Sequence, residues 1–303
     1  MNNQTKHRNI FPVSSTGGIL RCFLFAALVL FCVQAGVHAS VFKARIIPEN
    51  PKGGEALYIK ATGPEEYKYE ADFNGKSYDM FTATAGKHEL LLPTGIEGKG
   101  ARKIVLRALK NDKVAERKQF EVYVTKRKVK VIKLTESGEQ MRDTQPSVQT
   151  QQESVLDAIN IISKTRFWDA AFQLPLKTSG KSNFAVKREG KKYSYYHKGI
   201  DINAAEGAPV RAANTGRVAL AAEKLNIYGN AVVIDHGEGL VSCYFHLSKL
   251  SVKKGDEVSA GQEIGSVGST GWSSGPHLHF AVYVRGAPID PLWWIKFSEK
   301  IIQ

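Results

Sequence analysis

Two histidines near the end of the sequence, His277 and His279, occupy alternate positions in a run with the composition of a β-strand. Residues 277–284 read His-Leu-His-Phe-Ala-Val-Tyr-Val and are rich in aromatic and β-branched side chains. Side chains alternate between the two faces of a strand, so both imidazoles are expected on one face with Ala281 and Tyr283. Because a Gly-Pro turn precedes the run, we expect these imidazoles at the mouth of a functional site.

Two further side chains with metal-binding chemistry, His197 and Asp201, lie four positions apart. In a straight strand they would share a face but stand about 13 Å from one another. Gly199 lies between them and permits the bend that would bring them to one ion.

A further histidine, His246, ends a second run with strand character, Leu-Val-Ser-Cys-Tyr-Phe-His. Alternation puts it on one face with Ser242 and Tyr244 and puts Cys243 on the opposite face. Cys243 is the only cysteine beyond residue 39, so it is interpreted as a small buried hydrophobe. His236, which precedes a Gly-Glu-Gly turn, is interpreted as a hairpin-end residue outside the site.

Histidine and aspartate in this combination predict a zinc site. Neutral imidazole and carboxylate oxygen suit Zn²⁺, and a catalytic zinc takes three protein ligands and keeps one open position. Two histidines and one aspartate would fill that count and leave two histidines for acid–base chemistry. The helix-borne H-E-x-x-H pattern is excluded, because His88-Glu89 is followed by three leucines.

Short motifs in this region resemble, in order along the chain, those of the lysostaphin/LytM-type zinc endopeptidases of the M23 family. The resemblance covers residues from about 168 to 293 and is carried by His197-x-Gly-Ile-Asp201, Gly207-Ala-Pro-Val-Arg-Ala212, Tyr244-Phe-His-Leu247, Gly275-Pro-His-Leu-His-Phe280 and Gly286-Ala-Pro-Ile-Asp-Pro291. It implies a LytM-type antiparallel β-sheet in which His197, Asp201 and His279 hold Zn²⁺. It also implies that His246 and His277 are the catalytic pair beside a zinc-activated water.

One element departs from the family pattern. The family commonly has Phe-Gly-x-Arg upstream of the first ligand, whereas residues 184–188 here read Phe-Ala-Val-Lys-Arg, with Ala185 in place of glycine and one more residue. This departure concerns the wall of the substrate groove. Tyr193, Tyr195 and Tyr196 are expected either to supply an oxyanion donor or to line that groove.

Composition and the N-terminus indicate an exported protein. The 303-residue chain has a formal net charge of +13, which favours an acidic or polyanionic partner. Residues 1–39 combine basic residues, an apolar run at 22–33 and a small-residue site, which is typical of a secretory signal peptide. An uncleaved membrane anchor is the alternative for this segment. Outside the cytoplasm, the wall replaces nucleic acid as the expected partner.

The region before the motifs is predicted to be β-structured. Short alternating runs separated by turn clusters over residues 40–134 favour an immunoglobulin-like β-sandwich without paired cysteines. The basic run at 126–133 is expected to be its last strand, and His88 a solvated surface residue. Residues 135–165 are predicted to be a polar linker followed, from 154 to about 165, by a short helix that packs one domain on the other. Residues 166–303 would then form the peptidase domain.

These inferences converge on an exported zinc endopeptidase that hydrolyses peptide cross-links of peptidoglycan, located in the periplasm or cell envelope. The sandwich is expected to target, regulate or cover the enzyme, or to bind another envelope protein. A non-hydrolytic LytM-like regulator of cell-wall amidases is the first alternative. The second is a basic polyanion-binding protein with a structural zinc, which would need four closing ligands.

Overall fold

The computed structural model of the protein describes residues 40–134, 146–177, 182–191 and 194–302. The predicted signal peptide at 1–39 lies outside these residues. Strands dominate the described part of the chain, which contains the helices α2 (Pro146–Ile159) and α3 (Pro291–Ile302), so the prediction of a mainly β protein is confirmed. No helix in the described ranges is long and apolar enough to cross a membrane.

Residues 43–124 form two four-stranded antiparallel sheets that share one core. The first has the order β1-β2-β6-β5, formed by Lys43–Ile47, Ala56–Thr62, Lys87–Pro93 and Phe81–Thr84. The second has the order β4-β3-β7-β8, formed by Lys76–Asp79, Lys68–Phe73, Gly100–Lys110 and Lys113–Val124. Ile59 and Leu90 of the first sheet and Phe73 and Leu106 of the second are buried in this core, as alternation predicts. The immunoglobulin-like character of this sandwich stays a prediction.

The basic run at residues 126–133 does not complete the sandwich, so the expectation of a last sandwich strand there is wrong. Strand β8 ends at Val124, and β9 (Val131–Lys133) pairs in parallel with β10 (Lys187–Glu189). Strand β10 pairs antiparallel with β11 (Ser194–Tyr196). Alternation in the sequence indicates an extended segment, but the choice of neighbour depends on residues far along the chain.

Helix α2 begins and ends earlier than the helix expected from residue 154 to about 165. The Asn160 side chain donates a hydrogen bond to the Leu156 carbonyl at 2.8 Å and so satisfies a carbonyl in the last turn. Val155 and Ile159 are buried against the C-terminal sheet, whereas Ile162, beyond the helix end, is 49% exposed. The helix packs on β14, β15 and β16. The expectation that it packs one domain on the other stays a prediction.

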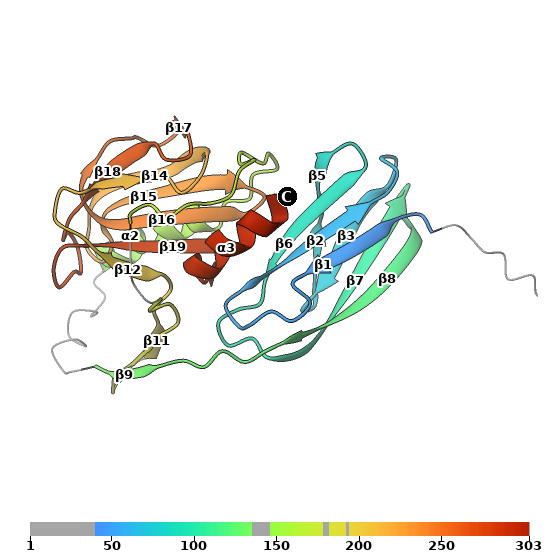
Figure 1. Cartoon of the computed structure of the whole chain (residues 1–303), viewed down its shortest axis with the longest axis horizontal. Helices are drawn as coiled ribbons and strands as arrows, with labels where there is room; N and C mark the ends of the chain where they lie inside the picture. Colours follow the sequence, from blue (N-terminus) through green and yellow to red (C-terminus); the bar gives the residue numbers. More distant parts are fainter. Residues whose placement is uncertain (1–39, 135–145, 178–181, 192–193, 303) are drawn as a thin grey trace, which may run out of the picture. The chain divides into compact units, whose positions relative to one another are not determined.

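A nine-stranded sheet carries four of the five predicted site residues, and His197 lies in the segment just before its first strand. Its main path has the order β12-β19-β16-β15-β14-β17, and β13, β18 and β20 join it at the sides. In chain order, β12 to β20 are Ile200–Asn203, Pro209–Arg211, Gly216–Leu225, Gly229–Gly237, Leu240–Leu250, Glu257–Val258, Glu263–Val267, His277–Val284 and Ala287–Ile289. Figure 1 shows β14, β15, β16 and β19 side by side.

This sheet buries a different set of side chains on each face. In β19, Leu278, Phe280 and Val282 belong to the larger core, which also contains Trp294 of α3. Ala281 and Tyr283 belong to a second core on the α2 side of the sheet. The alternation predicted for residues 277–284 is therefore confirmed, because odd and even positions separate between the two cores.

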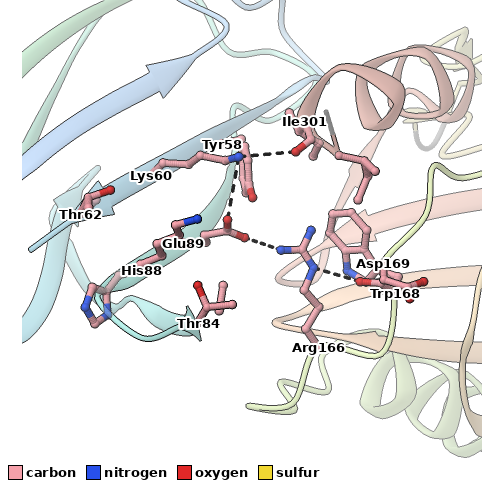
Figure 2. Close-up of a pocket in the computed structure, with 14 residues that line it drawn as sticks. Tyr58, Lys60, Thr62, Thr84, His88, Glu89, Arg166, Trp168, Asp169 and Ile301 are labelled. Atoms are coloured by element: carbon pink, nitrogen blue, oxygen red, sulfur yellow. Dashed lines mark hydrogen bonds and ion pairs between the residues drawn. The ribbon is translucent and has the colours of Figure 1, made fainter. Parts of the chain in front are cut away.

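Residues of β2 and β6 contact the C-terminal part of the chain through an ion-pair network (Figure 2). Glu89 pairs with Arg166 and, at 4.0 Å, with Lys60. The Lys60 ammonium also donates to the Ile301 carbonyl of α3 at 3.4 Å. Tyr58 of β2 is buried in the larger core of the C-terminal sheet, so apolar packing supports the same contact.

Two histidines outside the predicted site are buried. His88 is 5% exposed and its ring lies 4.1 Å from that of Tyr69, so the expectation of a solvated His88 is wrong. His236 has no exposed surface; its Nδ1 lies 2.8 Å from the Thr215 carbonyl and its Nε2 lies 2.7 Å from the Ser242 hydroxyl. Burial lowers the pKa of His236 to about 4.

The burial of His236 predicts a loss of stability in acid. The unfolded chain takes up a proton at this position below pH 6.5, whereas the folded chain does so only near pH 4. Stability is therefore complete above pH 6.5 and falls towards pH 4, by roughly 3 kcal/mol from this residue. Replacing His236→Gln should flatten the dependence of the free energy of unfolding on pH, measured by denaturant titration between pH 7 and pH 4.5.

Ser242→Ala is the matched control, because it removes the hydrogen bond to His236 and keeps the titrating ring. It should lower stability at all pH values and leave the slope unchanged. A His236→Gln slope equal to that of the unsubstituted protein would contradict the prediction.

Candidate functional site

Strand register brings the predicted site residues to one region of the sheet. Strand β19 lies between β12 and β16, and its His279 stands directly opposite Asp201 on one side and Phe245 on the other. His277 stands opposite Asn203 of β12. The order of the three strands, rather than closeness in sequence, therefore assembles the site.

Three of the predicted side chains converge on one point. His197 Nε2 lies 3.1 Å from Asp201 Oδ1 and 3.1 Å from His279 Nδ1. Asp201 Oδ1 lies 2.9 Å from His279 Nδ1. The ligand atoms of His197, Asp201 and His279 thus all lie within 4.8 Å of one another, which makes them a candidate metal group.

Gly199 is needed at its position because two backbones approach closely there. The chain bends at Gly199, as expected. A Cβ at this position would stand 2.4 Å from the Phe280 carbonyl oxygen and 2.7 Å from His279 Nε2, distances that no side chain tolerates. The glycine therefore lets the His197–Asp201 segment lie against β19 and leaves room for the His279 ring.

Asn183, which the sequence reasoning missed, fixes two of the converging residues. Its side-chain amide donates to Asp201 Oδ2 at 3.0 Å, and its side-chain oxygen accepts from the Asp201 backbone N–H at 3.0 Å. Its backbone carbonyl lies 3.0 Å from His197 Nδ1. A carbonyl only accepts, so Nδ1 of His197 carries the hydrogen and Nε2 faces the convergence point. In the sequence, the feature that could have pointed to Asn183 is its position directly before the Phe184 motif.

His246 reaches the site through an irregularity in β16. One extra residue of β16 stands opposite β15 between the pairs Asn230–Leu247 and Val232–Tyr244, and His246 adopts a left-handed backbone with φ of 66°. Such a conformation costs a non-glycine residue roughly 1–3 kcal/mol and is concentrated at functional sites.

The bulge changes the face on which His246 lies. Its ring centroid is 4.9 Å from that of His277 and 6.2 Å from that of His279, and the His279 ring in turn stacks on Phe245 at 5.7 Å. The expectation that His246 shares a face with Tyr244, opposite Cys243, is therefore wrong. Cys243 itself is buried in an apolar core, as interpreted from the sequence.

His246 and His277 are oriented alike. Nδ1 of His246 lies 2.8 Å from the Thr270 carbonyl, and Nδ1 of His277 lies 2.8 Å from the Gly275 carbonyl. Each Nδ1 therefore carries a hydrogen, and each Nε2 has a free lone pair when the ring is neutral. Nε2 of His277 lies 3.8 Å from Asp201 Oδ1. Burial lowers the pKa of His246 to about 4, so this ring is neutral and able to accept a proton at neutral pH.

Opposing effects act on the acidity of the central carboxyl. Burial by itself would raise the pKa of Asp201, but hydrogen bonds from His197 and His279 outweigh it and hold that pKa well below its usual range. Burial lowers the pKa of His279, against the opposing hydrogen bond to Asp201. Asp201 is thus a carboxylate. Its negative charge is balanced when one of the neighbouring imidazoles is protonated or when a cation lies between these rings and the carboxylate.

The donor set fits a zinc ion. Nε2 of His197 lies 3.1 Å from Asp201 Oδ1, and a cation bound between them would accept the imidazole lone pair and balance the negative charge of the carboxylate. Three ligand atoms bound at about 2.1 Å in a tetrahedral arrangement would stand about 3.4 Å apart, close to the separations found. Two imidazoles and one carboxylate are also the ligand types expected for a catalytic zinc.

The segment at residues 184–188, which differs from the family pattern, also lies at the site. Ala185 has a left-handed backbone with φ of 63°, which glycine would adopt without steric cost. The Arg188 guanidinium lies 3.9 Å from Asp201 Oδ2 and 5.9 Å from the Tyr195 ring centre. The Tyr196 hydroxyl donates to Glu97 at 2.6 Å, so it is engaged by the sandwich side of the chain. Tyr193 lies outside the described residues.

Comparison with known proteins gives a consistent picture. The family model described as peptidase family M23 matches residues 195–291. The chain is 44% identical over 96 residues to the peptidoglycan DD-endopeptidase ShyA of Vibrio cholerae, covering 32% of this chain and 22% of that protein. It is 43% identical over 99 residues to a lipoprotein NlpD/LppB homolog of Pseudomonas aeruginosa, covering 33% of each. The chain thus spans a third or less of these relatives.

A solved structure extends the likeness beyond the matched segment. A crystal structure of a putative peptidase M23 from Pseudomonas aeruginosa superposes with a TM-score of 0.56 and 22% identity, covering 81% of this chain and 94% of that one. This likeness concerns the fold alone. Residues 195–291, which include all five histidine and aspartate residues predicted for the site, are a domain of peptidase family M23.

Proposed function

We propose that the protein is a zinc-dependent endopeptidase that hydrolyses peptide cross-links of bacterial peptidoglycan. The observation that carries this proposal is the convergence of His197, Asp201 and His279 on one point, with two further imidazoles beside it. In this proposal the three converging residues hold the zinc ion. His246 and His277, whose Nδ1 atoms are bound by backbone carbonyls and whose Nε2 atoms make no hydrogen bond among the described contacts, are the catalytic pair.

A zinc ion held by these residues would supply Lewis acidity, which polarises a scissile carbonyl and makes water a stronger acid. The chain's own groups then handle the protons. A neutral His246 or His277 accepts the proton of the attacking water at Nε2, and the ring that becomes protonated donates to the leaving amine nitrogen. The carbonyls of Thr270 and Gly275 hold both rings in orientation during these transfers. Asn183 and the neighbouring Arg188 keep the Asp201 carboxylate in place.

The cell envelope is the proposed location. One relative is named a peptidoglycan DD-endopeptidase and another a lipoprotein, which supports a role at the wall. The predicted signal peptide and the net charge of +13 agree with an exported protein that meets an acidic polymer. Peptidoglycan stem peptides are accordingly the proposed substrate.

The regulator alternative is less well supported. A protein that only activates amidases needs neither a complete ligand set nor proton-transfer groups. Here two imidazoles are held by hydrogen bonds with Nε2 free, and His246 adopts a costly backbone to reach its position. Strain of this kind is kept where a side chain is needed for function.

The first prediction separates zinc ligands from catalytic residues. His197→Ala and His279→Ala should each weaken zinc binding by more than about 100-fold, because a three-ligand site loses a ligand. His277→Ala should retain about one zinc per chain, because its imidazole is not a ligand. Metal analysis after dialysis, with competition by a chromophoric chelator, measures both. Equal zinc loss in all three variants would contradict the assignment.

The second prediction concerns activity. The unsubstituted protein should release cross-linked peptide fragments from purified peptidoglycan, identified by mass spectrometry, and a chelator should abolish the release. His246→Ala should lower the rate by roughly 10²–10⁴-fold with zinc still bound, because a general acid–base group is lost. Absence of hydrolysis by the zinc-loaded protein would refute the proposed function, and activation of a purified amidase would then favour the regulator.

The third prediction concerns Asn183. Asn183→Ala removes both side-chain hydrogen bonds to Asp201 and should weaken zinc binding roughly 10–100-fold while the fold is kept. Ser182→Ala is the matched control, since the Ser182 hydroxyl bonds only to the Phe184 backbone N–H among the described contacts. The control should bind zinc as the unsubstituted protein does. Equal zinc affinities in Asn183→Ala and Ser182→Ala would show that Asn183 does not support zinc binding.

A further inference from the structure

Residues 126–133, which we call the basic strap, present four lysines that the proposed mechanism does not use. Exposure alternates over residues 126–130, where Lys126, Lys128 and Lys130 are exposed and Arg127 and Val129 between them are partly buried, whereas residues 131–133 are all exposed. One face of the strap is therefore turned towards the protein, and the other towards solvent. Lys133, at the end of β9, is exposed as well.

The inward face is firmly attached near the candidate site. Arg127 donates to the Gly53 carbonyl at 2.6 Å and pairs with Asp290 at 3.0 Å. Its guanidinium lies 5.2 Å from the ring centre of Phe184, the residue that follows Asn183. Because Asn183 holds both His197 and Asp201, the strap is linked to the site by a short chain of contacts.

The strap is also continuous with the strand that leads to the first proposed zinc ligand. Strand β9 pairs with β10, β10 pairs with β11, and β11 ends at Tyr196, directly before His197. Strand β9 is at the edge of this three-stranded sheet, so its outer backbone groups are unpaired within the described sheet. An extended peptide binds to such an edge through its main chain.

The lysines of the strap make no close ion pair among the described residues, although Glu189 stands opposite Lys133 in the sheet. None of the ion pairs among the described residues involves Lys126, Lys128, Lys130 or Lys133. Four ammonium groups held along a fixed extended segment raise the local positive potential and attract an anionic partner. A polymer with several carboxylates satisfies this requirement, because it meets successive lysines at once.

We propose that the basic strap is a docking surface for the carboxylate-bearing peptide portion of peptidoglycan, which it holds beside the candidate site. This proposal rests on the proposed function, of which it specifies substrate binding. The lysines contact stem-peptide carboxylates, and the free edge of β9 pairs with the peptide backbone. An anionic membrane offers charge but no extended peptide, so the edge strand favours the wall.

The test is a binding measurement that does not require catalysis. Purified peptidoglycan is pelleted with the full chain carrying His246→Ala, which prevents digestion during the assay. A strap variant adds Lys126→Gln, Lys128→Gln, Lys130→Gln and Lys133→Gln. The matched control makes the same charge change on the sandwich, with Lys43→Gln, Lys76→Gln, Lys103→Gln and Lys113→Gln, all exposed and without ion pairs among the described residues. Thermal melting checks that both variants are folded.

The strap variant should bind peptidoglycan roughly tenfold more weakly at low salt, because four exposed charge contacts are lost. Its affinity should also depend less on salt between about 50 and 200 mM, because fewer exposed charge contacts remain for the salt to screen. The control should bind as the parent does. Equal binding by strap variant and control would overturn the proposal.

Two other outcomes are informative. Strap-dependent binding to phosphatidylglycerol vesicles, without strap-dependent binding to peptidoglycan, would overturn the proposal in favour of a membrane surface. Strap-dependent binding to peptidoglycan by a protein that never hydrolyses it would uphold the docking surface and refute the proposed function. Hydrolysis of peptidoglycan by a protein whose binding does not depend on the strap would overturn the docking surface and uphold the proposed function.

Discussion

The site depends on the register between β12 and β19, which sets Asp201 directly opposite His279. In a sheet, a shift of one residue would move the side chains of a strand to the other face, and the two residues would no longer meet. The register is secured by Leu278, Phe280 and Val282, whose side chains fill the larger core on the opposite face. Apolar packing on one side of the strand therefore positions the candidate metal group on the other.

A partly buried carboxylate needs balancing charge and hydrogen bonds in the same region. Asn183 donates a hydrogen bond to Asp201, and the rings of His197 and His279 lie within hydrogen-bonding distance of the same carboxylate. Removing a charge from water is costly unless it is paired and hydrogen-bonded. The site therefore combines a rigid frame, built by backbone pairing, with a charge that favours a bound cation.

Contacts from outside the matched family segment support this frame. Asn183 and Arg188 precede residue 195, and Arg127 reaches Phe184 and Asp290 from the segment that follows the sandwich. The Tyr196 hydroxyl, next to His197, donates to Glu97. The M23 domain at 195–291 is thus held in part by residues that come before it in the chain. We expect the geometry of the site to respond to changes in those residues.

The sequence alone determined the strand alternation at 277–284, and its motifs indicated the five histidine and aspartate side chains proposed for the site, because both depend on local pattern. It also indicated correctly that Gly199 permits a bend. Only the tertiary structure decided that a bulge turns His246 to the face of His279, that Asn183 contacts both Asp201 and His197 and that β9 joins β10. A bulge, a hydrogen bond between residues 18 apart and a choice of strand neighbour depend on non-local contacts, which leave no periodic signal in the chain.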